Sequence, residues 1–225
     1  MKLDRDGTPF IAVSALPAAL LAVTRHRRLA GASLVLPLAI AAFFRDPDRA
    51  PELGGVHDPD VVLAPADGKV MHVGVPQEGV APPGDWQQIS IFLSLWDVHI
   101  NRTPAGGRVT EVGHRPGRYL AAFRAESAQE NERSEIAVEA TVGDEVRTIV
   151  FRQIVGVAAR RVVTRVAVGD ELAVGQRIGL MRFGSRMDVF VPPHVTIDVA
   201  VGDRTRAGES VLARWPSRLD AGAPS

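Results

Sequence analysis

The chain has 225 residues and carries 26 basic and 26 acidic side chains, which is the size of one domain or of one domain with an appendage. This charge balance argues against binding of nucleic acid through a global basic field. There is no cysteine, so disulfides, zinc–thiolate sites, iron–sulfur ligation and thiol nucleophiles are excluded. Hydrophobic residues at 46% and charged residues at 23% are typical of a folded globular protein.

The first 44 residues contain two apolar runs, 10–23 and 29–44, each interrupted by one proline. Both are shorter than the roughly 20 residues of a usual spanning helix. We predict a short apolar helical hairpin over 1–44 that associates with a membrane, the alternative being two buried or mutually packed helices. The basic cluster at 25–28 suits anionic lipid headgroups. A cleaved signal peptide is disfavoured by the acidic residues near the start and by the second run.

After a charged, proline-containing break at 45–49, the chain becomes rich in Val, Ile and Gly, with turns between short apolar runs. The pattern predicts a mainly β fold: a barrel or sandwich-type β domain over 45–214, preceded by the helical hairpin and followed by a frayed tail over 215–225. A polar stretch at 126–132 is interpreted as a loop. Strands are predicted at 61–64, 69–75, 88–95, 98–100, 107–112, 134–142, 147–157, 161–166, 177–181, 187–191 and 196–201.

The common catalytic signatures are missing from the sequence. It has no G-x-G-x-x-G after a strand, no phosphate-binding P-loop and no G-x-S-x-G elbow. Its six histidines lack the close pair spacing of a helix-borne metal site, so we expect no metal centre. Nucleotide binding and zinc chemistry are therefore disfavoured.

Three segments combine polar side chains with turns or strand ends. Residues 64–70 place an acid, Asp67, on a tight turn, residues 93–104 place polar groups at the end of an apolar strand, and residues 179–189 contain a Gly-Ser pair. Each segment alone has an ordinary interpretation, as a hairpin turn, a structural histidine or a routine turn. Their order along the chain is more informative than any one of them.

Together these segments resemble the phosphatidylserine decarboxylase family in its short form, from about residue 43 to residue 192. Residues 43–49 resemble the family's segment after a membrane-associated N-terminus, and residues 182–186 resemble its processing site. Further segments that resemble the family lie at 129–133, 153–156 and 159–161.

The resemblance implies an enzyme that makes its own cofactor. Ser185 would attack the carbonyl of Gly184, and β-elimination of the resulting ester would separate a β chain, 1–184, from an α chain, 185–225. Ser185 would become a covalent pyruvoyl group, with neither pyridoxal phosphate nor a metal. Its ketone would form a Schiff base with the amine of phosphatidylserine and accept the electrons left as CO2 departs, giving phosphatidylethanolamine.

A serine hydroxyl needs a base, often one oriented by a carboxylate. By resemblance, His99 and Asp67 are the catalytic partners of Ser185. Larger relatives carry a second histidine where this chain has Arg102, and arginine cannot act as a base at neutral pH. His99 is therefore assigned to cleavage, to proton donation after decarboxylation, or to both, and Arg102 to binding the substrate phosphate or carboxylate.

The implied partners are phosphatidylserine in an anionic membrane and the α and β chains of one precursor, with a homo-oligomer left open and no nucleic acid. The implied location is the cell membrane, peripherally or through the N-terminal apolar segment. Two alternatives remain. One is a non-catalytic, membrane-anchored β-domain adaptor or carrier related to lipoyl-type barrels, which predicts an intact chain. The other is a pyruvoyl enzyme acting on another amine-bearing substrate.

Overall fold

The computed structural model of the protein describes residues 2–50, 58–157, 161–182 and 184–216. The chain divides into two compact units, Met1–Asp48 and Arg49–Ser225. Most of the predicted tail, from residue 217 onward, lies outside the described residues, as do residues 159 and 160 of one segment that resembles the family. The domain boundary predicted at 44/45 falls a few residues before the division between the two units.

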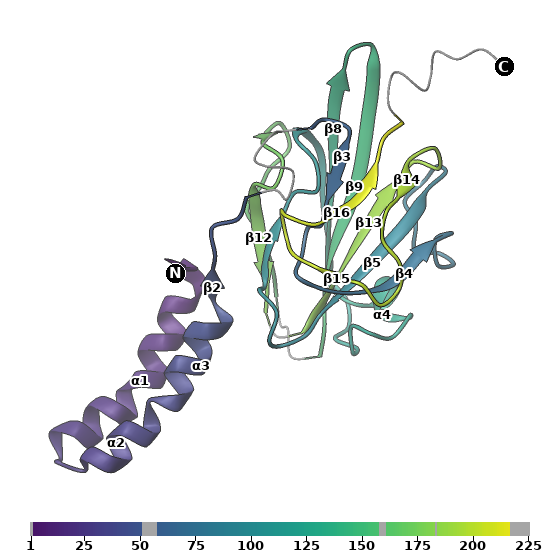
Figure 1. Ribbon diagram of the computed structural model, residues 1–225. Helices are drawn as coiled ribbons and strands as arrows, with labels where there is room; N and C mark the ends of the chain where they lie inside the picture. The colour runs from purple at the N-terminus through teal and green to yellow at the C-terminus, as the bar shows by residue number, and fades with distance from the viewer. Residues whose placement is uncertain (1, 51–57, 158–160, 183, 217–225) are drawn as a thin grey trace. The chain divides into compact units, whose positions relative to one another are not determined.

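The N-terminal unit is a helical hairpin. Helix α1 folds back along α2 and α3, as Figure 1 shows, and the short strands β1 and β2 pair antiparallel at its base. The predicted apolar hairpin is thereby confirmed. Its elements are β1 (Lys2–Leu3), a 3-10 turn (Arg5–Gly7), α1 (Thr8–Val23), α2 (Arg27–Ser33), α3 (Val35–Phe43) and β2 (Arg45–Asp46).

The second apolar run forms two helices that meet at Leu34. Pro37 has no N–H to donate to the carbonyl of Ser33 four residues back, so a continuous helix would lose a bond there. In the structure Pro37 lies in the first turn of α3, where N–H groups have no intrahelical partner in any case. Pro37 thus fits the start of α3, whereas α1 continues through Pro17, so a proline alone does not decide where a helix breaks.

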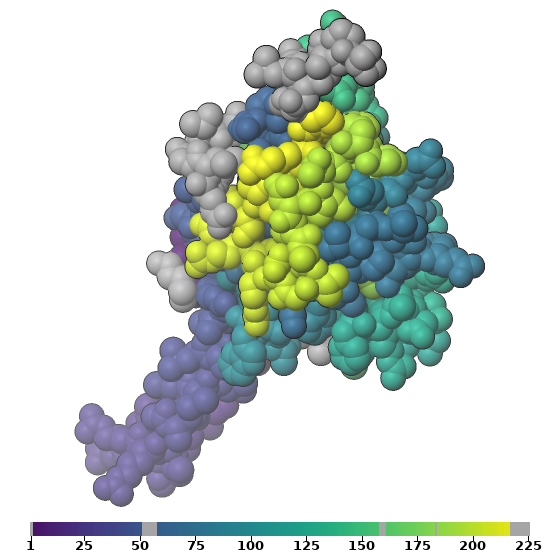
Figure 2. Space-filling model, turned by 45° about the vertical axis from the view of Figure 1, so that its right-hand side comes forward, coloured from purple at the N-terminus to yellow at the C-terminus, as the bar shows by residue number. Residues whose placement is uncertain are grey.

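The second unit is built around an antiparallel eight-stranded sheet in the order β11-β7-β8-β9-β13-β5-β4-β15, curled into a half-barrel (Figure 1). Two three-stranded sheets, β10-β12-β6 and β14-β16-β3, accompany it. Figure 2 shows the yellow-green C-terminal segment lying beside the blue segment of β4 and β5, in agreement with the pairing of β15 with β4. The elements are β3 (Val61–Leu63), β4 (Gly68–Gly74), β5 (Gln87–Leu93), β6 (Ile100–Arg102), β7 (Gly107–Arg115), α4 (Ser127–Glu130), β8 (Arg133–Val142), β9 (Glu145–Val155), β10 (Val162–Thr164), β11 (Glu171–Leu172), β12 (Arg177–Met181), β13 (Ser185–Val191), β14 (Thr196–Ile197), β15 (Arg204–Thr205) and β16 (Val211–Arg214).

Strand β13 lies at the centre of this sheet and is buried on both faces. Because side chains alternate along a strand, Met187 and Val189 point into the main core on the inner face. Phe190 points to the other face and packs in a second cluster with Val80 and Ala128. A strand covered on both sides holds its first residue, Ser185, in a fixed position.

The predicted mainly β fold class is confirmed, although several element bounds differ. The strand predicted at 98–100 runs instead over β6, because Asn101 and Arg102 pair with β12 despite their polarity. The stretch predicted as a loop at 126–132 contains the single helical turn α4. The short strands β11, β15 and β16 were not predicted, since two to four residues carry too little periodicity.

Candidate active site

Ser185 is the first residue of β13 and lies between two strands. It stands in register with Leu93 of β5 and Val155 of β9. Its side chain is fully buried, and its Oγ has no hydrogen-bond partner within the part of the chain that the structure describes. Leaving a buried hydroxyl unpaired costs about 1–3 kcal/mol, so such a group calls for a reason. The missing partner would be explained if the hydroxyl is kept available for a reaction.

Gly184 precedes this serine in a left-handed conformation, with φ at +69°. Glycine adopts this region without the steric cost that a side chain would bring. The carbonyl oxygen of Gly184 packs against the Cα of Gly156, so closely that a Cβ at position 156 would overlap with it. Two glycines thus leave room around the predicted cleavage site.

His99 lies beside the same peptide segment and is buried. The N–H of Gly184 donates to His99 Nε2 at 3.3 Å, while His99 Nδ1 lies 3.0 Å from the backbone oxygen of Asp97. An N–H can only donate and a carbonyl oxygen can only accept, so the proton of a neutral ring resides on Nδ1. The lone pair of Nε2 therefore points to the N–H of Gly184, beside the predicted cleavage site.

Asp67 and Arg102 have their described contacts in a second group of residues. One Asp67 oxygen accepts from the N–H of Ala207, at 2.8 Å, and the other from Arg49, also at 2.8 Å. Arg102 donates to the carbonyl of Gly175 and packs against Gly208, next to Ala207. The structure thus brings His99 to Gly184, the residue before Ser185. It brings Asp67 and Arg102 to two adjacent residues, Ala207 and Gly208.

Arg49, to which the sequence alone gave no role, bridges Asp67 and Glu209 through two hydrogen bonds of 2.8 and 2.9 Å. Burial alone would lower the pKa of Arg49, but the charges of Asp67 and Glu209 and their hydrogen bonds outweigh it and raise the pKa above the ordinary value. The charge of Asp67 is thereby compensated locally. Residues far apart in sequence meet here, so a local sequence pattern does not reveal this bridge between Arg49 and the two carboxylates.

A row of buried polar side chains lines the inner side of the same end of the half-barrel. Gln153 donates to Asn101 Oδ1 at 2.8 Å and accepts from Thr164, which in turn accepts from Ser134. Asn101 lies in β6, two residues after His99 in the sequence, and its buried Nδ2 has no partner among the described residues. This amide is a spare donor.

The opposite face of β13 carries a fully buried ion pair, which the sequence analysis also missed. Arg186 Nε donates to Asp188 at 2.6 Å, and its Nη2 donates to Gln77 at 2.6 Å and to Ser90 at 3.0 Å. Both charged side chains are completely buried. The residue directly after Ser185 is thus fixed by a polar network.

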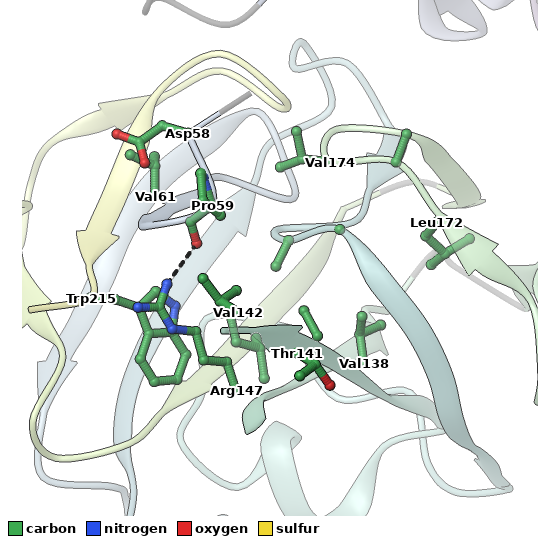
Figure 3. A pocket seen from close by; sticks show the side chains of 15 residues that line it. Asp58, Pro59, Val61, Val138, Thr141, Val142, Arg147, Leu172, Val174 and Trp215 are labelled. Atoms are coloured by element: carbon green, nitrogen blue, oxygen red, sulfur yellow. Dashed lines mark hydrogen bonds between the residues drawn. The ribbon is translucent and has the colours of Figure 1, made fainter. Parts of the chain in front are cut away.

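A cavity of about 340 Å³ lies away from this site. Its lining includes Val138 and Val142 of β8 and Arg147 near the start of β9. Ser185 instead pairs with Val155, at the other end of β9. Figure 3 shows the Arg147 guanidinium beside the Trp215 ring and donating to Pro59. Arg147 is also paired with two carboxylates, so the cavity offers no free charge for an anion.

Among the described residues, no group of three or more His, Asp or Glu side chains is arranged to hold a metal ion. The helical segment Arg5–Val23 has the length and composition of a membrane-crossing helix. By length and composition alone this is weak support for an anchor, because core helices and signal sequences share these properties.

Comparison with known proteins gives the class and then the family. Residues 36–213 match the model of a family of decarboxylases described as phosphatidylserine decarboxylase. The chain is 42% identical over 197 residues to the phosphatidylserine decarboxylase proenzyme of Solibacter usitatus, covering 85% of this chain and 87% of the relative. It is 38% identical over 211 residues to that of Geotalea uraniireducens, covering 94% and 95%, and 42% identical over 210 residues to that of Mycolicibacterium smegmatis, covering 92% and 87%.

The chain belongs to the phosphatidylserine decarboxylase family, and it is therefore an enzyme, a decarboxylase. The family resemblance predicted from the sequence is confirmed. Membership decides against the alternative of a non-catalytic adaptor. The name proenzyme, which the relatives carry, refers to a precursor that is processed.

Proposed function

We propose that this enzyme converts phosphatidylserine to phosphatidylethanolamine and CO2 with a pyruvoyl group that it makes by cleaving itself between Gly184 and Ser185. One observation carries the proposal: a buried Oγ without a described partner directly follows a left-handed glycine whose N–H meets an unprotonated histidine nitrogen. The proenzyme relatives add support, because their name fits a chain that is made whole and then processed.

Cleavage would begin with Ser185 Oγ attacking the carbonyl carbon of Gly184. The bond from that carbon to the Ser185 nitrogen breaks and an ester replaces the peptide. His99, whose Nε2 accepts from the N–H of the neighbouring Gly184, is the proposed acceptor of the hydroxyl proton. Loss of the Ser185 α-proton then expels the Gly184 carboxylate and leaves a dehydroalanine. Water replaces its nitrogen, ammonia leaves, and a ketone remains at residue 185.

The residues around Ser185 fit such a group. The pyruvoyl ketone would condense with the substrate amine and act as the sink for the electrons released with CO2. His99 could then return a proton to the α-carbon, and the spare amide of Asn101 could hold a carboxyl or carbonyl oxygen of the substrate. Arg102 as a ligand of the substrate phosphate or carboxylate stays a prediction, as does Asp67 as a catalytic group.

The first test is intact mass under denaturing conditions. The purified wild-type protein should separate into two chains, 1–184 and 185–225, the smaller with a blocked N-terminus, because a ketone replaces its amine. A Ser185→Ala variant should stay whole and release no CO2 from phosphatidylserine labelled in the serine carboxyl group. A folded wild-type chain that stays intact yet releases CO2 would contradict the proposed cofactor.

A cleaved enzyme that acts on free serine as fast as on phosphatidylserine would favour the alternative of a pyruvoyl enzyme for soluble amines. We place the enzyme at the cell membrane, because its substrate is a lipid and its hairpin exposes many apolar side chains. Phosphatidylserine in an anionic membrane is its proposed partner, and the two products of cleavage would remain associated through β13.

A further inference from the structure

We propose that the catalytic unit has its own membrane-contacting surface, separate from the helical hairpin. We call it the apolar rim and define it as Leu95, Trp96, Phe123 and Val157. The proposal rests on the function proposed above, because it assumes that the lipid headgroup must reach Ser185. It adds that the bilayer meets the β-unit at these four side chains.

The rim consists of large apolar side chains that point into solvent. Trp96 is 86% exposed, Val157 65%, Phe123 63% and Leu95 54%. Exposed apolar residues scattered singly are common on proteins and need no explanation. These four side chains come from three separate loops. They form one surface only if the loops converge.

The loops converge at the buried start of β13. Leu95 follows Leu93 by two residues and Val157 follows Val155 by two, and Leu93 and Val155 are the residues on either side of Ser185 in the sheet. Phe123 belongs to the third loop, whose Ala122 lies against Gly156. In both views the segment leading into α4 lies at the surface, at the lower end of this unit (Figure 1, Figure 2). The rim thus surrounds the end of the sheet that holds Ser185.

Two of the rim loops, those of Trp96 and Phe123, are held in place by contacts behind them. Asp97 accepts from both the backbone and the hydroxyl of Ser94, at 2.8 and 2.6 Å, which closes the turn that presents Leu95 and Trp96. The Phe123 ring meets the Phe92 ring edge-on at 6.1 Å. Because the exposed tips stand on fixed bases, little ordering cost is expected when they enter a bilayer.

A phospholipid bilayer is the occupant that this position favours. The acyl chains of phosphatidylserine stay in the bilayer while its headgroup must reach a buried serine, so the bilayer surface has to lie at the entrance to that serine. Tryptophan and phenylalanine are suited to the interface, where an apolar ring meets wet headgroups. Arg124, exposed beside Phe123, adds positive charge for an anionic surface.

The test compares a rim variant with a matched control. Trp96→Ser/Phe123→Ser should raise the KM for phosphatidylserine in anionic vesicles by about tenfold or more, as expected for lost apolar burial in the interface. Its kcat on a short-chain phosphatidylserine dispersed below its micellar concentration should stay within about twofold of wild type. Val146→Ser/Val201→Ser removes two equally exposed valines outside the rim and should leave both values unchanged.

A direct readout uses tryptophan fluorescence. The chain has three tryptophans, and replacing Trp86 and Trp215 by Phe leaves Trp96 alone. Vesicles that contain bromine-labelled lipid should then quench its emission and shift it to the blue. An unquenched Trp96, or a rim variant with wild-type KM on vesicles, would overturn the proposal.

The fluorescence measurement also separates this proposal from the proposed function. It can be made in the full-length Ser185→Ala precursor, which needs no cleavage to bind a membrane. If wild-type protein fails to cleave but Trp96 is still quenched by the bilayer, the pyruvoyl mechanism is wrong and the membrane surface stands. If cleavage proceeds and Trp96 stays unquenched, the membrane surface is wrong and the pyruvoyl mechanism stands.

Discussion

At the scale of single residues, His99 is held in one tautomer by two backbone groups of opposite hydrogen-bonding character. We expect His99→Gln to accumulate uncut precursor, with cleavage slowed about 10²- to 10⁴-fold, because glutamine can keep hydrogen bonds but cannot take up a proton. The uncut fraction is followed over time by denaturing electrophoresis. His194→Gln, at an exposed position, is the matched control. Cleavage of His99→Gln at the wild-type rate would assign the base to another residue.

Gly156 permits a second residue-level prediction, because a Cβ there would overlap with the Gly184 carbonyl oxygen. The oxygen would have to move, and the alignment of the carbonyl with Ser185 Oγ would be lost. We expect Gly156→Ala to fold but to process at least about 10²-fold more slowly, since small misplacements of reacting atoms have effects of this size. Mass analysis gives the cut fraction, and Gly113→Ala, where a Cβ would meet only the Glu111 side chain at 4.0 Å, is a control for adding a methyl group. Normal processing of Gly156→Ala would show that this contact does not position the carbonyl.

Asp67 has a structural role in addition to the catalytic role that its motif predicts. The sequence suggested a relay partner for a histidine, whereas in the structure both of its oxygens accept bonds, from Arg49 and from Ala207. Those bonds tie the segment before β4 to the segment before β16, which are far apart in sequence. Asp67 therefore contributes to positioning these two segments whether or not it also takes part in catalysis.

At the scale of the element, β13 carries a buried ion pair one residue beyond the proposed cleavage point. Arg186→Met would leave the Asp188 carboxylate buried without its cation, which we expect to lower the free energy of unfolding by about 3–5 kcal/mol. The double variant Arg186→Met/Asp188→Leu removes both charges and should recover most of that loss. Denaturant unfolding of the uncut Ser185→Ala precursor measures both values on an unbroken chain. A double variant as unstable as the single one would mean that packing, and not charge, sets the cost.

The same ion pair bears on what happens after cleavage. After the proposed cleavage residue 185 would be a chain end, and chain ends fray unless they are tied down. Arg186 is bonded to Asp188, Gln77 and Ser90, and β13 keeps β5 and β9 on its two sides. A ketone at residue 185 would therefore stay where the serine was, at the buried end of the sheet.

The elements also show which features a sequence can predict. The hairpin and the long strands came from local patterns, because a helix or strand of seven or more residues repeats its apolar spacing often enough to be recognised. The polar strand β6 was misplaced by two residues, because its register is set by β12, about 80 residues further on. His99 and Ser185 could be proposed from family segments. Gly156 and Arg49 also lie in segments that resemble the family, 153–156 and 43–49, but what they do depends on contacts with distant residues. Such contacts exist only in the folded chain.

At the scale of the whole molecule, the two parts that we propose to contact the membrane would have distinct tasks. The hairpin exposes an apolar stripe along α1, formed by Val13, Leu16, Leu20 and Val23 at intervals of three and four residues. It can tether the enzyme to a bilayer, whereas the apolar rim would bring the headgroup to the catalytic unit. A tether raises the local concentration of enzyme at the lipid surface without affecting the chemistry.

This division of tasks predicts that tethering and self-cleavage can be separated. Leu16→Gln/Leu20→Gln should reduce flotation of the protein with anionic vesicles by about a hundredfold, because burying two leucine side chains is worth about 3–6 kcal/mol. Both residues lie in the N-terminal unit and the cleavage site lies in the other, so processing into two chains should proceed at the wild-type rate. Leu16→Met/Leu20→Met keeps the stripe apolar and should behave like wild type in both measurements. If the glutamine variant floated normally, the hairpin would not be the tether. If it failed to cleave, membrane binding would be a condition for cleavage, and the two units would be coupled through the bilayer.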